Sequence, residues 1–171
     1  MKIIAHPAPK PLSKIAPTLG LVAAVTLAVM VVLQLIGLGK MLSSLSAQFG
    51  GHDGWSIAVT VIALITELAA LPFLLRLKLS YLASLCSGVA AVLAPWVWVL
   101  VVVWSIGGTD VAAAQFGVAG GFNIGWWLLA VNVVWMAFNF YTVRELNIEK
   151  IWYTATGLKP RSELKKKNHD R

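Results

Sequence analysis

Four long hydrophobic segments, separated by short polar stretches, dominate the pattern of this sequence. They run from about residue 15 to 38, 55 to 75, 79 to 106 and 122 to 143. Each reaches the roughly 20 apolar residues that a helix needs to cross the hydrocarbon core of a bilayer. Because lipid offers no hydrogen-bond partners, the backbone of each segment must satisfy itself, as an α-helix does. The pattern predicts an all-α integral membrane protein, built as a four-helix bundle.

Polar stretches of different character connect and flank these segments. We expect loops at 41–54 and 107–121, both rich in glycine, and a tight basic turn between the second and third segments. The N-terminal tail, 1–14, contains three prolines that oppose a helix. The C-terminal tail, 144–171, begins with a stretch that either continues the fourth helix or lies along the membrane surface. A cleaved signal peptide is the alternative for the first segment, but its apolar core exceeds the 7–15 residues typical of such peptides.

Composition and charge agree with a membrane protein. Hydrophobic residues make up 58% of the 171 residues and charged residues only 12%, against about 25% charged in soluble domains. This leaves no room for a soluble catalytic domain. Thirteen of the 14 Lys and Arg residues lie in the two tails and the turn, and the exception is Lys40 in the first loop. The positive-inside rule therefore predicts that both termini face the cytoplasm of a cell whose plasma membrane holds the protein.

One acidic residue, Glu67, lies near the middle of the second segment. A charge at that depth costs about 3 kcal/mol, so we expect the side chain to face the interior of the bundle. Thr60, Ala63 and Ala70 share its helical face, and such small residues allow helices to approach closely. Two hypotheses remain: a proton relay or quinone-contacting acid, and a protonated carboxyl that holds helices together by hydrogen bonds. The second is favoured because no other charge lies within a segment to serve as a relay partner.

Uncharged polar residues in the other segments are candidates for interhelical hydrogen bonds. Gln34, Asn132 and Asn139 are the main ones, and Ser84 and Ser87 are further candidate partners for the acid. In the C-terminal tail, the run of Lys165, Lys166 and Lys167 is expected to contact anionic lipid headgroups.

Residues typical of catalysis, metal binding or cofactor binding are missing from the hydrophobic segments. The three histidines lie in tails or loops, so no pair is placed to ligate haem or a metal within the bundle. No nucleophile or phosphate-binding motif is present. The single cysteine, Cys86, excludes an internal disulfide, and we expect its thiol to be buried and inert. The sequence thus predicts a protein that is not an enzyme and binds no cofactor, metal or nucleic acid.

Two short stretches resemble known membrane proteins. Residues 67–77 (ELAALPFLLRL), following GLGK at 37–40, resemble small four-helix membrane proteins of actinobacteria. These include accessory subunits of the cytochrome bcc–oxidase respiratory supercomplex. A Gly-Lys pair after the first span and a Glu in the second are also similar to DoxX-like proteins, which are linked to redox metabolism.

Three functions are consistent with these observations. The first is a non-catalytic accessory subunit of a larger membrane complex, for which the resemblance implies a respiratory-chain assembly and other integral membrane subunits as partners. The second is a DoxX-like redox-associated protein. The third is a small transporter component that uses Glu67.

Overall fold

The computed structural model describes residues 6–104, 115 and 125–156, and the extended elements of regular structure in these residues are all helices. The prediction of four helices long and apolar enough to span a membrane is confirmed; they are α1, α3, α4 and α6. Two shorter helices, α2 and α7, accompany them. The bounds are α1 Ala16–Ile36, α2 Leu38–Gln48, α3 Asp53–Leu74, α4 Tyr81–Trp104, α6 Gly125–Glu145 and α7 Ile148–Thr156.

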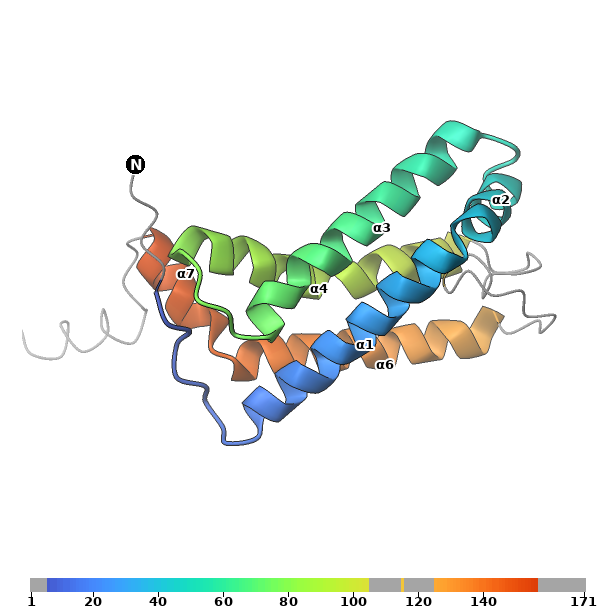
Figure 1. Cartoon of the computed structure of the whole chain (residues 1–171). Coiled ribbons are helices and arrows are strands. Elements are labelled where there is room, and N and C mark those ends of the chain that lie inside the picture. Colours follow the sequence, from blue (N-terminus) through green and yellow to red (C-terminus); the bar gives the residue numbers. More distant parts are fainter. Residues whose placement is uncertain (1–5, 105–114, 116–124, 157–171) are drawn as a thin grey trace, which may run out of the picture.

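The long helices pack as two pairs that cross each other (Figure 1). Helices α1 and α3 run side by side and cross α4 and α6, with α3 packing mainly on α4 and α6 also packing on α4. Small residues line the contacts, and Gly20 shows how close they are. A Cβ at Gly20 would lie 2.7 Å from the backbone oxygen of Leu74 and 3.2 Å from the Leu146 side chain. Close backbone approach of this kind is how helices associate in lipid.

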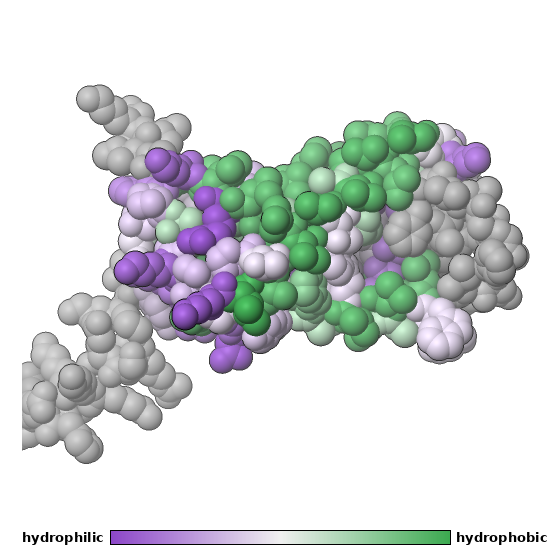
Figure 2. Space-filling model, turned by 60° about the horizontal axis from the view of Figure 1, so that its bottom comes forward, coloured by the Kyte–Doolittle hydropathy of each residue, from purple (hydrophilic) through white to green (hydrophobic). Residues whose placement is uncertain are grey.

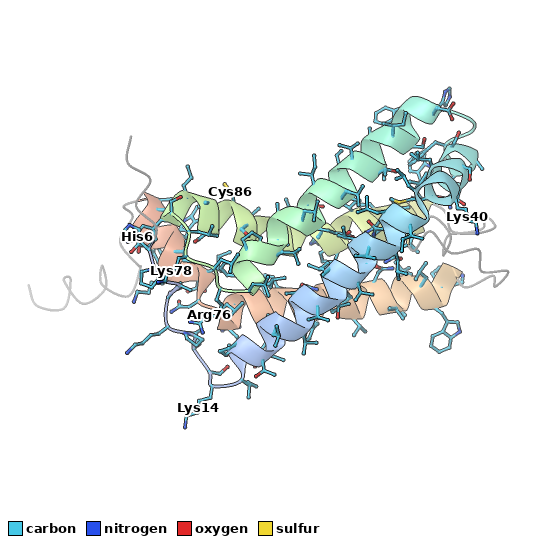
Figure 3. All side chains as sticks on the ribbon, viewed as in Figure 1. His6, Lys14, Lys40, Arg76, Lys78 and Cys86 are labelled. Atoms are coloured by element: carbon cyan, nitrogen blue, oxygen red, sulfur yellow. The ribbon has the colours of Figure 1, made fainter. Side chains whose placement is uncertain are left out.

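The two ends of the molecule differ, while its middle is apolar. Exposed large hydrophobic side chains occur on all four long helices. Figure 2 shows the broad apolar surface that they form on one face of the molecule, and we name this middle part the apolar belt. The basic end, as we name it, carries α7, the α3–α4 turn and the side chains of Lys14, Arg76 and Lys78, whereas α2 and Lys40 lie at the opposite, α2 end (Figure 3). The predicted separation of basic residues along the chain is therefore also a separation in space.

Helix α2 occupies most of a stretch that we expected to be a loop, so that expectation is wrong for residues 41–48. Met41 and Leu45, four residues apart, are fully buried and pack with Trp98 in a cluster at this end of the molecule. The hydroxyl of Ser43 donates to the backbone oxygen of Lys40, which satisfies it within the helix. Two apolar residues at helical spacing thus outweighed the serines and glycines that suggested a loop.

A serine of α4 forms hydrogen bonds with the backbone of α3 near Pro72. Ser87 Oγ accepts a hydrogen bond from the backbone N–H of Phe73 at 2.9 Å and donates to the backbone oxygen of Ala69 at 2.5 Å. In a regular helix, these two backbone groups would bond to each other. The inserted hydroxyl satisfies both of these groups, which lie next to the disturbance that the proline introduces into the helix.

The N-terminal tail is extended and lies across the basic end. Its backbone accepts hydrogen bonds from two turn residues: Arg76 Nη2 bonds Pro9 O at 3.1 Å, and Asn147 Nδ2 bonds Lys10 O at 3.1 Å. Arg76 and Asn147 both have positive φ, 55° and 67°, and end helices α3 and α6 in the left-handed conformation. Asn147 also separates α6 from α7, so the stretch after Arg144 forms its own short helix rather than continuing the fourth span.

Candidate functional site

The carboxyl group of Glu67 lies where three spanning helices meet. It is fully buried on α3, between the two main apolar clusters of the molecule. Gln34 Nε2 on α1 donates to Glu67 Oε1 at 3.1 Å, and Trp98 Nε1 on α4 donates to the same oxygen at 2.8 Å. One carboxyl oxygen therefore joins α1, α3 and α4.

The predicted inward face of α3 is confirmed. Thr60, Ala63 and Ala70 are all buried together with Glu67. Alanine at 63 and 70, one turn on either side of the acid, leaves room for Gln34 and Trp98 to reach its carboxyl group from the neighbouring helices.

Two buried oxygen atoms at this junction have no hydrogen-bond partner among the described residues. They are Glu67 Oε2 and Gln34 Oε1, and they belong to the two groups that the 3.1 Å bond already joins. Both are acceptors when the carboxyl group is ionised, whereas a protonated carboxyl carries one O–H donor. A proton on Glu67, or a small molecule with a hydrogen-bond donor, could therefore satisfy these oxygen atoms. The bonds that Glu67 already makes connect three helices.

Sequence reasoning did not assign Trp98 to this junction. The signal was present in the spacing of α4, where Ser87, Ala91, Ala94 and Trp98 recur at helical intervals and are all buried. Such a stripe of small residues ending in a tryptophan indicates an inward-facing indole. A buried indole N–H needs an acceptor, and an acid in the neighbouring span supplies one.

The other predicted amides make different contacts. Asn132 on α6 forms two reciprocal hydrogen bonds of 2.9 Å with Gln115, and both side chains are buried. Gln115 falls in a stretch expected to be a loop, and nothing in the sequence pattern singled it out. Asn139 is fully buried and donates to the backbone oxygen of Trp135 on its own helix, while its Oδ1 has no partner in the described part of the structure.

The remaining predicted residues lie away from the junction. Ser87 bonds the backbone of α3 rather than Glu67. Cys86 is exposed on the surface of α4 (Figure 3), so the expectation that it is buried is wrong. Lys165, Lys166 and Lys167 lie outside the described residues. In the described ranges, no group of three or more His, Cys, Asp or Glu side chains comes together.

Comparisons with family models, with curated proteins and with solved structures gave no match to this chain.

Proposed function

We propose that this chain is a non-catalytic accessory subunit of a larger complex of integral membrane proteins. The supporting observation is a hollow between α3 and α4 that opens on the apolar belt. We name it the α3–α4 groove. It has a volume of about 290 Å³, and all of its lining residues are apolar: Phe49, Val59, Ile62, Val97, Leu100, Val101 and Trp104.

The shape of this groove supports a protein helix as its occupant. Helices α3 and α4 separate toward the α2 end (Figure 1), and residues of both helices line the groove. Leu100 and Trp104 are 63% and 73% exposed, one turn apart on α4, and Trp96 extends the same stripe toward the middle of the span at 44%. In lipid, apolar surface alone does not drive association, so packing of complementary shapes must do so. A furrow with rigid aromatic edges offers such packing to a transmembrane helix.

The state of Glu67 agrees with a structural role. Its carboxyl group is engaged by two donors from other helices rather than presented on the surface. The proposal extends to the location: the plasma membrane, with the basic end and both termini on the cytoplasmic side, as the positive-inside rule implies. The sequence resemblance makes a respiratory-chain assembly the first complex to test.

Extraction in mild detergent, followed by native electrophoresis and mass spectrometry, tests the proposal. We expect the chain to migrate together with larger membrane proteins, which mass spectrometry identifies. A photo-crosslinking residue at position 100, in the α3–α4 groove, should link to one of those same subunits. Val29 on α1 is a matched control, because it is similarly exposed at 52% but lies outside the groove.

Two outcomes would contradict this function. One is migration of the chain as a lone small species in every mild detergent. The other is equal cross-linking from positions 100 and 29 to the same proteins, which would show that the groove has no special role in association.

A transporter component that uses Glu67 is the second candidate. The observation that favours it is the buried Oε2 atom, which lacks a partner in the described part of the chain and is free to carry a proton. If Glu67 carries protons, Glu67→Gln should abolish proton-coupled flux in proteoliposomes. Unchanged flux would remove the residue from any transport mechanism.

A further inference from the structure

A second hollow on the apolar belt has charged residues at one end. We name it the α4–α6 groove; it has a volume of about 320 Å³ and lies where α4, α6 and the start of α7 meet. Val92 and Leu93 of α4 and Phe140 and Val143 of α6 form its apolar walls. Leu93 and Phe140 are 47% and 60% exposed, so the groove opens outward to the surroundings of the belt.

The end of this groove that approaches the basic end is lined by two opposite charges, Arg144 and Glu149. Both side chains are exposed, and neither forms an ion pair or a side-chain hydrogen bond within the described residues. Arg144 lies one helical turn from Phe140, about 6 Å along the axis, so the charged end of the groove is adjacent to its apolar walls. A cation and an anion at the end of an apolar groove are complementary to a molecule that carries both charges and a hydrocarbon chain.

We propose that the α4–α6 groove binds one phospholipid whose headgroup carries a phosphate and a primary ammonium, as in phosphatidylethanolamine. The guanidinium of Arg144 holds the phosphate, for which its fork of N–H donors is suited. The carboxylate of Glu149 accepts hydrogen bonds from the ammonium. An acyl chain fills the groove between Leu93 and Phe140.

The same two charges select against the other common phospholipids. Phosphatidylcholine has a trimethylated nitrogen without N–H donors, so it loses the hydrogen bonds to Glu149. Phosphatidylglycerol has a phosphate but no cation, so Glu149 lies next to a second negative charge. This specificity is independent of the accessory-subunit proposal, because the α4–α6 groove and the α3–α4 groove share no lining residue.

Native mass spectrometry of the purified, delipidated protein tests the proposal. The protein is mixed with phosphatidylethanolamine, phosphatidylcholine or phosphatidylglycerol of identical acyl chains, and the retained lipid is counted. We expect one phosphatidylethanolamine per protein, bound roughly tenfold more tightly than either other lipid, which corresponds to about 1.4 kcal/mol.

Variants separate the two contacts. Glu149→Leu, which removes the acceptor, should remove the preference for phosphatidylethanolamine over phosphatidylcholine, and Arg144→Gln should weaken binding of both lipids by about tenfold. Glu145→Gln and Lys150→Gln are matched controls, because these charges are adjacent in sequence but do not line the groove, and they should change nothing. Leu93→Trp, which fills the groove, should lower retention of every phospholipid.

The proposal is overturned by any of three results. These are equal or tighter binding of phosphatidylglycerol, equal effects of the control and groove variants, and unchanged retention in Leu93→Trp. Occupation of the groove by a second copy of the chain, seen as a dimer that lipid does not dissociate, would also contradict it.

Discussion

At the scale of single residues, the two oxygen atoms of Glu67 have different surroundings. Oε1 accepts hydrogen bonds from Gln34 and Trp98, while Oε2 has no partner among the described residues. The two bonds to Oε1 do not require a negative charge, because the carbonyl oxygen of a neutral carboxyl or of an amide can accept both. The hydrogen bonds that join the three helices therefore require an acceptor atom at this position, not a negative charge.

Substitutions at Glu67 distinguish the acceptor from the charge. Glu67→Gln keeps an acceptor of the same shape, so the thermal midpoint of the purified protein should change little. Glu67→Leu has a similar size but leaves the donors of Gln34 and Trp98 buried and unpaired, so it should cost about 1–3 kcal/mol per group left unsatisfied. Glu67→Lys adds donors where donors already converge, and it should prevent assembly of the native fold.

The comparison between the first two variants is decisive. If Glu67→Gln destabilises the protein as much as Glu67→Leu, measured by thermal unfolding in the same detergent, the charge itself must contribute and the argument from the acceptor is wrong.

At the scale of elements, α3 and α4 depend on each other through the hydroxyl of Ser87. This hydroxyl bonds both Phe73 N–H and Ala69 O, which lie on either side of Pro72. A proline inside a spanning helix is tolerated when a neighbouring side chain satisfies the freed backbone groups. The backbone hydrogen bonds of α3 beside Pro72 therefore depend on a side chain of α4.

Ser87→Ala should destabilise the protein because it removes the partner of two buried backbone groups, at a cost of about 1–3 kcal/mol. Ser84→Ala is a matched control on the same helix, since the Ser84 hydroxyl makes no hydrogen bond in the described structure. Thermal unfolding in one detergent gives the comparison.

A double-mutant cycle extends this test. In a Pro72→Ala background the α3 ladder can close without help, so Ser87→Ala should cost clearly less there. Equal costs in the two backgrounds would show that Ser87 does not act on the proline-disturbed ladder.

Prediction from sequence succeeded for elements whose signal is local. The length of each apolar segment and the lone Glu67 among small residues identified four spans and the inward face of α3, because lipid imposes both constraints on every residue. It failed where partners come from elsewhere in the chain. Helix α2 is held by Met41 and Leu45 packing under Trp98, and Ser87 bonds α3 rather than Glu67. Neither contact can be read from one segment alone.

At the scale of the whole molecule, an apolar belt separates two polar ends of different charge (Figures 2 and 3). The α2 end carries Lys40, and the exposed tryptophans Trp55, Trp104, Trp126 and Trp127 lie at the helix termini on that side, as expected for rings at a membrane interface. The basic end carries the α3–α4 turn and the described part of the N-terminal tail. The positive-inside rule predicts one orientation for a molecule with this distribution of charge.

Cysteine labelling tests that orientation. In a Cys86→Ala background, Lys40→Cys should react with a membrane-impermeant maleimide in intact cells, and Lys78→Cys only after permeabilisation. Both positions are exposed, so reactivity reports the side of the membrane rather than burial. The reverse pattern would place the basic end outside and contradict the predicted topology.

The contacts of the N-terminal tail have a consequence for the order of events during synthesis. Leu12 N–H bonds Glu145 O, and Pro9 and Lys10 bond Arg76 and Asn147. Arg76 follows the second span, whereas Glu145 and Asn147 lie at the end of the fourth, so this set of contacts is complete only after α6 has been inserted. Resistance of the tail to a protease marks a chain whose spans have all been inserted and packed, and a truncated or stalled chain leaves the tail open to cleavage.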